Sequence, residues 1–420
     1  MGIKIAIVVQ RYGVEVNGGA EYHARVLAEK LSDGYEVEVL TTTALDYHSW
    51  ANHYPSGEES INGIKVYRFP TVKKEKKREY RVARRAVLKE RKYFKLLKAS
   101  GLFNFFDKYF NITEAKPQEI ENWVIDRGLY CPDLISFIKS NKEQYDAFIF
   151  FTYLYHPTVI GMPIVADKSI FIPTAHDESL LYMQPNKSIF SVPKFIMYNT
   201  ESEKKLIEDH FEHCTKNHDI AGVGIEKYMG EELELPNYVE TKKYFVYIGR
   251  IVEEKGCDQM LEYYVRFQQE NIQYNDYKLV LIGKNDMGIP YEDSNILYTG
   301  FIPEELKYTL LRHAKAMIMP SFYESLSMVT LEAMKEGIPV IVNQKCEVLY
   351  EHIMKSGTGS AYDSYESFCT SLISYIDKSD KDMEPEAKKA ERYVTENYTW
   401  DTILSKFHSA FNFVVTESLR

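Results

Sequence analysis

The chain has 420 residues, of which 45% are hydrophobic and 27% charged, and its formal net charge is −10. This length exceeds what one hydrophobic core supports, so two domains of about 200 residues each are expected. No run approaches the roughly 18 consecutive apolar residues of a transmembrane helix, and the acidic balance disfavours nucleic acid as a partner.

The cysteines and the N-terminus indicate a cytoplasmic protein. The five cysteines are Cys131, Cys214, Cys257, Cys346 and Cys369. They are scattered without a C-x-x-C pair, which favours a reducing compartment and disfavours zinc or a disulfide framework. The first residues, Met1–Val9, lead directly into a strand pattern and lack the features of a signal peptide.

Short buried-strand patterns alternate with helical ones along the chain. The first series of predicted strands is Ile3–Val9, Val37–Thr42, Ile64–Phe69, Ala147–Tyr153, Ser169–Thr174, Phe195–Asn199 and Ile220–Val223. The second series is Phe245–Ile248, Lys278–Ile282, Ile296–Tyr298, Ala316–Met319 and Pro339–Val342. The alternation predicts an α/β protein with two doubly wound parallel sheets, and the stretch Gly222–Lys243 predicts the linker between them. In such sheets ligands bind at the carboxyl ends of the strands.

The first strand is followed by a turn that contains a glycine pair. Gly18 and Gly19 stand just before the predicted helix Ala20–Leu31. Glycines at a helix start let a ligand approach the backbone closely, and the N–H groups there favour an anion. The turn is not G-x-G-x-x-G, so a dinucleotide cofactor is disfavoured. The pair is either a phosphate-binding turn or a flexible turn without a ligand.

Residues 73–98 form the most basic segment of the chain. They hold thirteen Lys or Arg and three Glu, a local charge of +10, so the remainder carries −20. Apolar residues recur there at helical spacing, and the aromatic run Leu102–Phe110 follows. A basic amphipathic helix with aromatic neighbours is typical of membrane-surface binding. A solvated helix on the first domain is an equal alternative, and nucleic-acid binding is a weaker one.

A histidine and two cations follow later strands. His176 comes after the strand Ser169–Thr174, where a lone histidine is more often structural. Arg250 and Lys255 lie in the turn after the strand Phe245–Ile248. Arginine offers a planar fork and lysine a point charge for phosphate oxygens, so together they suit a diphosphate leaving group. Two solvated charges in a loop are the alternative.

Two glutamates eight positions apart lie where a loop becomes a helix. Glu324 falls in the loop after the strand Ala316–Met319, and Glu332 falls in the predicted helix Met328–Lys335. The helix N-terminus favours an anion, and the carboxylates can accept hydrogen bonds from sugar hydroxyls. This combination suits a nucleotide sugar. The alternative is an ordinary capped helix with two solvated glutamates.

Asp380 and Asp382 have the D-x-D spacing of some metal sites. They lie in a Ser-, Lys- and Asp-rich stretch before Pro385, with no strand leading into them, which predicts a solvated loop. No other cluster has metal-ligand spacing, so neither a metal nor a cofactor is expected.

These motifs resemble those of a known family. Ser321–Glu332, with Gly337-Ile-Pro339-Val after it, resembles the E-x7-E signature of retaining glycosyltransferases of family 4, which have the GT-B fold. Gly249-Arg250 followed by Lys255-Gly256 is similar to the diphosphate-binding pattern of that family, and Gly18-Gly19-Ala20-Glu21 is similar to its G-G-x-E element. The resemblance covers nearly the whole chain.

The resemblance implies two Rossmann-like domains that face a cleft. Residues 1–222 would form the acceptor-side domain and residues 223–398 the domain that binds the nucleotide sugar. The last helix, at 399–420, would pack back on the first domain.

By this resemblance, the reaction is transfer of a hexose from a nucleotide sugar to a hydroxyl, with retained configuration. Arg250 and Lys255 would stabilise the departing diphosphate. Glu324 would accept hydrogen bonds from the donor sugar, and Glu332 from the ribose. His176, in an Ala-His-Asp-Glu run similar to one in a subgroup of bacterial members, would position the sugar. The other implied donor-binding residues are Gly18, Gly19, Gly249, Ser325, Leu326 and Ser327.

The chain also departs from the family. Ser325 and Ser327 stand where glycines are usual, and Asn343–Glu347 replaces a usual Gly-Gly. The implied partners are a nucleotide sugar and a glycan or lipid-linked acceptor, as in bacterial cell-surface polysaccharide synthesis, with the enzyme in the cytoplasm or at the inner face of the plasma membrane. A sugar-nucleotide epimerase and a non-catalytic partner subunit are the alternatives. The residues identify neither the base, the sugar nor the acceptor.

Overall fold

The computed structural model describes residues 2–16, 18–73, 100–102, 117–178, 180–183, 186, 188–211, 213–287 and 293–418. The basic segment at 74–98 and the aromatic run at 103–110 lie outside the described residues. The chain divides into two compact units, Met1–Ala221 with Leu404–Arg420, and Gly222–Ile403. The divisions expected from the sequence lay after residue 222 and before residue 399.

The first unit is built on a sheet of eight strands among the described residues. The strands are β1 Lys4–Val8, β2 Glu36–Thr42, β3 Gly57–Ile61, β4 Ile64–Phe69, β5 Ala147–Phe151, β6 Ser169–Ile172, β7 Phe195–Tyr198 and β8 His218–Ile220. Their order is β3-β4-β2-β1-β5-β6-β7-β8, and every pairing is parallel except that of β3 with β4. The chain moves outward in both directions from β1 and β5, so the switch point of this sheet lies between those two strands.

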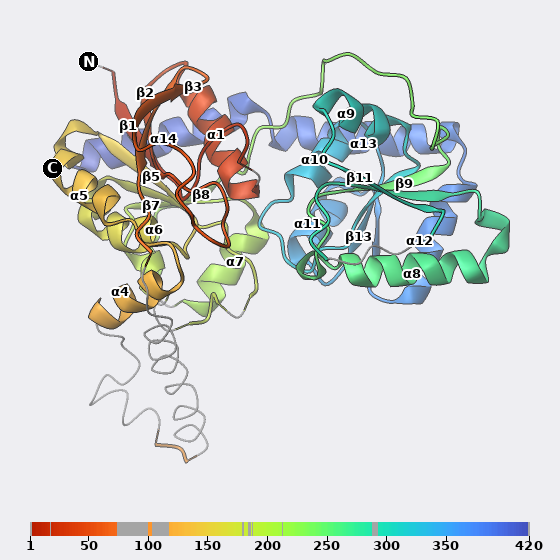
Figure 1. The fold of residues 1–420 in the computed structure, drawn as a ribbon, viewed down its shortest axis with the longest axis horizontal. Helices are drawn as coiled ribbons and strands as arrows, with labels where there is room; N and C mark the ends of the chain where they lie inside the picture. The colour runs from red at the N-terminus through yellow and green to blue at the C-terminus, as the bar shows by residue number, and fades with distance from the viewer. Residues whose placement is uncertain are drawn as a thin grey trace. The chain divides into compact units, whose positions relative to one another are not determined.

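Helices connect these strands (Figure 1). They are α1 Gly19–Leu31, α4 Pro117–Asp126, α5 Pro132–Asn141, α6 His156–Gly161, α7 Glu201–His210 and, from the C-terminal end of the chain, α14 Trp400–Ser418. Right-handed crossovers that lead away from a switch point in opposite directions place helices on both faces of a sheet.

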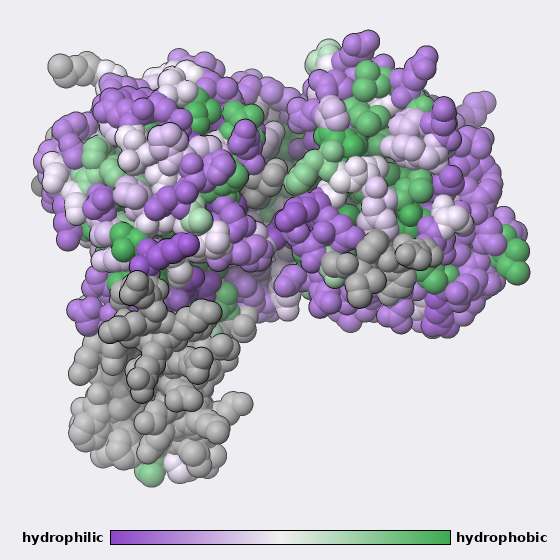
Figure 2. All heavy atoms as spheres, viewed as in Figure 1, coloured by the Kyte–Doolittle hydropathy of each residue, from purple (hydrophilic) through white to green (hydrophobic). Residues whose placement is uncertain are grey.

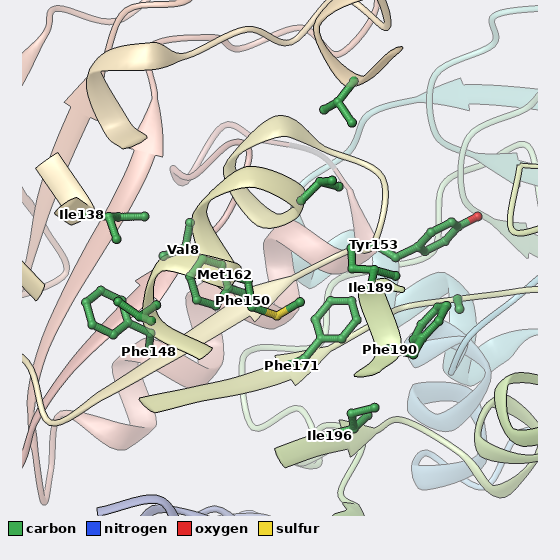
Figure 3. Packing of buried hydrophobic residues seen from close by; sticks show 14 of the residues in the cluster. Val8, Ile138, Phe148, Phe150, Tyr153, Met162, Phe171, Ile189, Phe190 and Ile196 are labelled. Carbon is green, nitrogen blue, oxygen red and sulfur yellow. The ribbon is translucent and has the colours of Figure 1, made fainter. Parts of the chain in front are cut away.

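Aromatic side chains dominate the core of the first unit. Phe148 and Phe150 on β5, Phe171 on β6 and Phe190 are fully buried, and Figure 3 shows them packed in one cluster. Aromatic side chains of this size contribute most to the free energy of folding through the apolar area that they bury. The core thus packs β5 and β6 against each other, and His176 lies in the loop after the carboxyl end of β6.

The second unit is built on a parallel sheet of six strands in the described part of the chain. The strands are β9 Tyr244–Ile248, β10 Lys278–Ile282, β11 Ile296–Gly300, β12 Ala316–Met319, β13 Val340–Asn343 and β14 Ser360–Tyr362. Their order is β11-β10-β9-β12-β13-β14, which places the switch point between β9 and β12. The helices are α8 Cys257–Glu270, α9 Glu304–His313, α10 Met328–Lys335, α11 Glu347–Ser356, α12 Tyr365–Asp377 and α13 Asp380–Asn397.

The predicted fold class of two doubly wound, Rossmann-like sheets is confirmed, and the structure corrects some elements. The predicted loop at Asp380 and Asp382 is wrong, because α13 begins there. Ser379 caps this helix in a capping box with Asp382, and both aspartates are exposed. The strand expected at Ile220–Val223 lies earlier, at His218–Ile220.

The surface of both units is largely hydrophilic on the face drawn in Figure 2, with smaller hydrophobic areas between. Within the described ranges, no helix has both the length and the apolar character needed to cross a membrane.

Candidate functional site

Two loops flank the switch point of the second sheet. The loop after β9 carries Arg250 and Lys255, and the loop after β12 carries Glu324. Lys255 Nζ lies 2.6 Å from Glu324 Oε1, so an ion pair joins the loops. The side chain of Lys255 is 29% exposed and that of Glu324 14% exposed, so the lysine remains partly accessible to solvent. The carboxyl end of a parallel sheet at its switch point is where such folds bind ligands.

Gly256 lets the two loops approach each other. Its φ is 70°, in the left-handed region, and a Cβ at this position would lie 2.4 Å from the carbonyl oxygen of Pro320. Glycine alone meets both conditions without strain. The residue after Lys255 therefore fixes the distance between the lysine and Glu324.

Gly249 and Gly283 bring a third loop to the same edge of the sheet. Gly283 follows β10 with φ of 138°, and a Cβ there would lie 2.0 Å from the carbonyl oxygen of Gly249. The next carbonyl, that of Arg250, accepts a hydrogen bond of 2.7 Å from the hydroxyl of Tyr247. Gly283 thus has a packing role, a Cβ at Gly249 would itself lie 2.9 Å from the Tyr247 hydroxyl, and Tyr247 fixes the backbone of the turn that carries Arg250.

The turn from Glu324 into α10 contains a strained residue. Ser327 has φ of 61°, and a left-handed conformation costs a non-glycine residue about 1 kcal/mol. Its hydroxyl lies 2.8 Å from Thr330 Oγ1, and its carbonyl accepts the backbone N–H groups of Thr330 and Leu331. The sequence places Ser325, Leu326 and Ser327 together, and the structure shows that they form this one turn.

A buried histidine that the sequence analysis missed supports the same turn. His352 on α11 is fully buried, with Nε2 2.7 Å from the carbonyl oxygen of Leu326 and Nδ1 2.9 Å from the hydroxyl of Tyr393. Burial lowers the pKa of His352, so the ring is neutral at pH 7. Nε2–H then donates to the carbonyl and Nδ1 accepts from the tyrosine. His352 lies 26 positions from Leu326, so no local motif reveals the contact.

Glu332 has a cationic partner of its own. Lys307 on α9 places Nζ 3.3 Å from Glu332 Oε2, and the glutamate side chain is 12% exposed. Burial raises the pKa of Glu332, while the charge and hydrogen bond of Lys307 oppose that rise. Glu324 and Glu332 are therefore each paired with a different lysine. The sequence analysis did not single out Lys307, because it stands in an ordinary amphipathic helix.

The glycine pair of the first unit lies against a buried ion pair. Arg11 Nη2 is 2.6 Å from Glu21 Oε1, and both side chains are less than a tenth exposed. A Cβ at Gly18 would lie 2.1 Å from Glu21 Oε2, so the glycine makes room for this pair. Gly19 begins α1 and is exposed. Glu21 therefore supports the turn from inside, and Gly19 is the member of the pair that faces solvent.

His176 follows β6 and lies in the first unit, near another glutamate. Its Nε2 is 3.5 Å from Glu178 Oε1, which also accepts a 2.6 Å hydrogen bond from the hydroxyl of Tyr153. Glu203 supports this loop from below, because its carboxyl oxygens accept the backbone N–H groups of Ala175 at 2.5 Å and Asn199 at 2.6 Å. The His176 side chain is 33% exposed, which leaves it accessible.

Metal ligands do not gather in the described part of the chain. No group of three or more His, Cys, Asp or Glu residues there is arranged to hold a metal ion. Glu324 and Glu332 are instead paired with cationic side chains, Glu324 with Lys255 and Glu332 with Lys307.

Comparison with known proteins agrees with this geometry. Residues 231–393, which include the loops of Lys255 and Glu324 but not those of the first unit, match the family described as glycosyl transferases group 1. An uncharacterized glycosyltransferase of Methanocaldococcus jannaschii is 23% identical, with 96% of each chain covered. Glycogen synthase of Trichodesmium erythraeum is 29% identical over 37% of this chain and 36% of its own.

Solved structures share the fold over the full length. Sucrose-phosphate synthase from Thermosynechococcus elongatus matches with a TM-score of 0.67 and 13% identity, covering 99% of this chain and 100% of its own. WaaG, a glycosyltransferase involved in lipopolysaccharide biosynthesis, matches with a TM-score of 0.61 and 14% identity, covering 98% and 99%. The chain thus has the GT-B fold, and residues 231–393 of its second unit are similar to the glycosyl transferases group 1 family.

Proposed function

We propose that the protein is a retaining glycosyltransferase that moves a hexose from a nucleotide sugar to the hydroxyl of a glycan or lipid-linked acceptor. The observation that carries this proposal is the Lys255–Glu324 ion pair, which joins the two loops at the switch point of a glycosyltransferase group 1 domain. It supplies a cation for a phosphate and a carboxylate for a sugar hydroxyl within 2.6 Å of each other.

The ion pair suggests how the donor is received. A diphosphate carries more negative charge than one carboxylate, so it competes with Glu324 for the charge of Lys255. When Lys255 turns to the diphosphate, Glu324 can accept hydrogen bonds from the sugar that is attached to it. Arg250, on the same loop as Lys255, would add a second cation as the leaving group gains charge.

The remaining roles follow from the same assignment. Glu332 would accept hydrogen bonds from the ribose, and His176 would position the donor sugar. The departing phosphate would serve as the base for the acceptor hydroxyl. The proposed reaction uses no metal, because Arg250 and Lys255 supply the positive charge that neutralises the diphosphate.

The proposal also assigns the protein to a cell-surface polysaccharide pathway, on the cytoplasmic side of the membrane. Its support is the basic segment 73–98, whose charge of +10 suits an anionic membrane that presents a lipid-linked acceptor. One structural relative, WaaG, is itself involved in lipopolysaccharide biosynthesis.

A turnover assay tests the proposed function. Release of nucleoside diphosphate would be measured for UDP-, GDP-, ADP- and dTDP-hexoses, with the wild type and with Arg250→Ala and Lys255→Ala. Each substitution should lower kcat by about 10²-fold, the usual cost of losing preorganised charge at a leaving group. Lys388→Ala is the matched control, because Lys388 is on α13, with a side chain that is 72% exposed and paired with Glu384.

The outcomes separate the alternatives. Rates within a few-fold of wild type for both variants would contradict the diphosphate assignment. Conversion of the donor sugar without release of nucleoside diphosphate would indicate an epimerase. Binding of a donor without any turnover would indicate a non-catalytic subunit.

A further inference from the structure

Glu332 faces a conflict between burial and charge. Its side chain is 12% exposed on α10, and a buried carboxyl favours the neutral form. A ribose diol offers two hydroxyl donors, and an ionised carboxylate accepts such donors more strongly than a neutral carboxyl does. The group that keeps Glu332 ionised therefore affects how tightly the site holds a nucleotide.

Lys307 is placed to resolve this conflict. Its Nζ lies 3.3 Å from Glu332 Oε2, and its charge and hydrogen bond both lower the pKa of the glutamate. The other groups that face Glu332 from α9 are Glu304, which raises that pKa, and Tyr308, whose hydrogen bond lowers it. One turn further along α10, Glu336 is already paired with Arg312 at 2.8 Å.

Lys307 is itself held in place. Its Nζ is 3.6 Å from Glu304 Oε1 and 4.3 Å from the ring centroid of Tyr308, and its side chain is 17% exposed. The Tyr308 ring is stacked in turn on Tyr228, with centroids 4.3 Å apart and an angle of 5° between the planes. A cation fixed on several sides loses little conformational entropy when it holds a partner, unlike a lysine in solvent.

We propose that Lys307 is a positioning residue that keeps Glu332 ionised and oriented for the ribose hydroxyls of the nucleotide. The proposal rests on the proposed function, because it takes Glu332 as the ribose acceptor. Lys307 does not contact the nucleotide in this account and acts only through Glu332.

Calorimetric titration distinguishes this role from a merely structural one. UDP, GDP and ADP would be titrated into the wild type, each beside its 2′,3′-dideoxy counterpart, and dTDP, which has only the 3′-hydroxyl, beside its 3′-deoxy counterpart, from pH 5.5 to 8.5. For the nucleotide that binds, the wild type should prefer the hydroxylated form by about tenfold, the value of one good hydrogen bond to a charged group. Lys307→Met should lose most of that preference at low pH and recover part of it as the pH rises, because Glu332 then ionises without help.

Three further variants complete the test. Lys307→Arg should restore the preference and its pH profile. Lys307→Gln keeps a donor without the charge, and it replaces Lys307→Met if that variant does not fold. Lys335→Met removes the same charge from α10, where Lys335 Nζ binds Thr395 Oγ1 at 2.7 Å, and should match the wild type.

Two failures remain distinguishable. If no nucleoside diphosphate binds the wild type, the proposed function is wrong, and the role of Lys307 fails with it. If the wild type binds and discriminates but the Lys307 variants keep the same preference at every pH, only the role of Lys307 is wrong.

Discussion

Single residues set the geometry of the candidate site. Gly256 brings Lys255 against the loop of Glu324, because any side chain there would meet the carbonyl oxygen of Pro320. Ser327 holds the next turn in a left-handed conformation, which glycine would adopt without strain. The strain at Ser327 is offset in part by the hydrogen bond between its hydroxyl and Thr330 Oγ1.

Two substitutions at Ser327 separate strain from hydrogen bonding. Ser327→Ala keeps the Cβ in the left-handed region and loses the hydroxyl, whereas Ser327→Gly loses both. The glycine variant should be more stable than the alanine variant by about 1 kcal/mol, after allowing for the extra freedom of glycine in the unfolded chain. Urea unfolding at pH 7 measures the difference, and equal stabilities or the reverse order would show that the turn is not strained.

Elements of structure differ in how well the sequence predicts them. The central strands were readily predicted, since β10 and β12 are continuous apolar runs with the expected bounds. The strand β3 was missed because Gly57–Ile61 is an edge strand with mostly exposed residues and shows no apolar alternation. The helix start at Asp380 was missed because Pro385 indicates a loop, yet the capping box at Ser379 starts the helix first.

The residues of the candidate site also differ in how well the sequence predicts them. The Lys255–Glu324 contact agrees with the motifs that singled out both residues. Lys307 and His352 were not predicted, because each acts on a partner about 25 positions away through tertiary packing alone. A lone lysine or histidine in an amphipathic helix carries no pattern that distinguishes it from a surface or core residue.

The hydrogen bond from His352 on α11 to the turn at Ser325–Ser327 predicts an effect on the free energy of unfolding. His352→Phe leaves the carbonyl of Leu326 and the hydroxyl of Tyr393 without this partner. Each buried polar group that loses its partner costs about 1–3 kcal/mol. The free energy of unfolding should therefore fall by about 2 kcal/mol or more. An unfolding free energy of His352→Phe equal to that of the wild type in urea unfolding would contradict this role.

The same residue predicts a pH effect. Because burial lowers the pKa of His352, the unfolded chain takes up the proton first, and the free energy of unfolding falls as the pH drops below about 6.5. His352→Phe should lose this part of the acid sensitivity. The unfolding free energy of both proteins, measured from pH 7.5 to 5, should therefore converge toward low pH, and parallel curves would contradict a neutral buried histidine.

At the scale of the whole molecule, each unit carries candidate residues of its own. The first unit contributes His176 and the glycine pair, and the second contributes the two lysine–glutamate pairs. Helix α14 begins at Trp400 in the second unit, and from Leu404 onward it belongs to the first unit.

Chelation tests the proposed metal independence. Turnover of the donor should persist in excess EDTA, because Arg250 and Lys255 supply the neutralising charge. Complete loss of activity that manganese or magnesium restores would contradict this expectation.

Liposome binding tests the proposed membrane acceptor. The wild type should co-sediment with anionic liposomes at low salt and dissociate as salt rises, since surface attraction is screened over about 8 Å at physiological ionic strength. Changing Arg81, Arg84, Arg85, Lys89 and Lys92 to Glu should abolish binding and leave donor hydrolysis intact. Wild-type protein that ignores these liposomes at low salt would indicate that the basic segment is only a solvated surface.

The central claim is that the loops at the switch point of the second sheet bind a nucleoside diphosphate, and calorimetric titration tests it most directly. At least one of UDP, GDP, ADP and dTDP should bind the wild type, and Lys255→Ala should weaken binding by about tenfold or more, as expected for loss of a charge-assisted contact. Lys388→Ala should leave the affinity unchanged. Failure of all four nucleotides to bind, or equal affinity for the wild type and Lys255→Ala, would contradict the account.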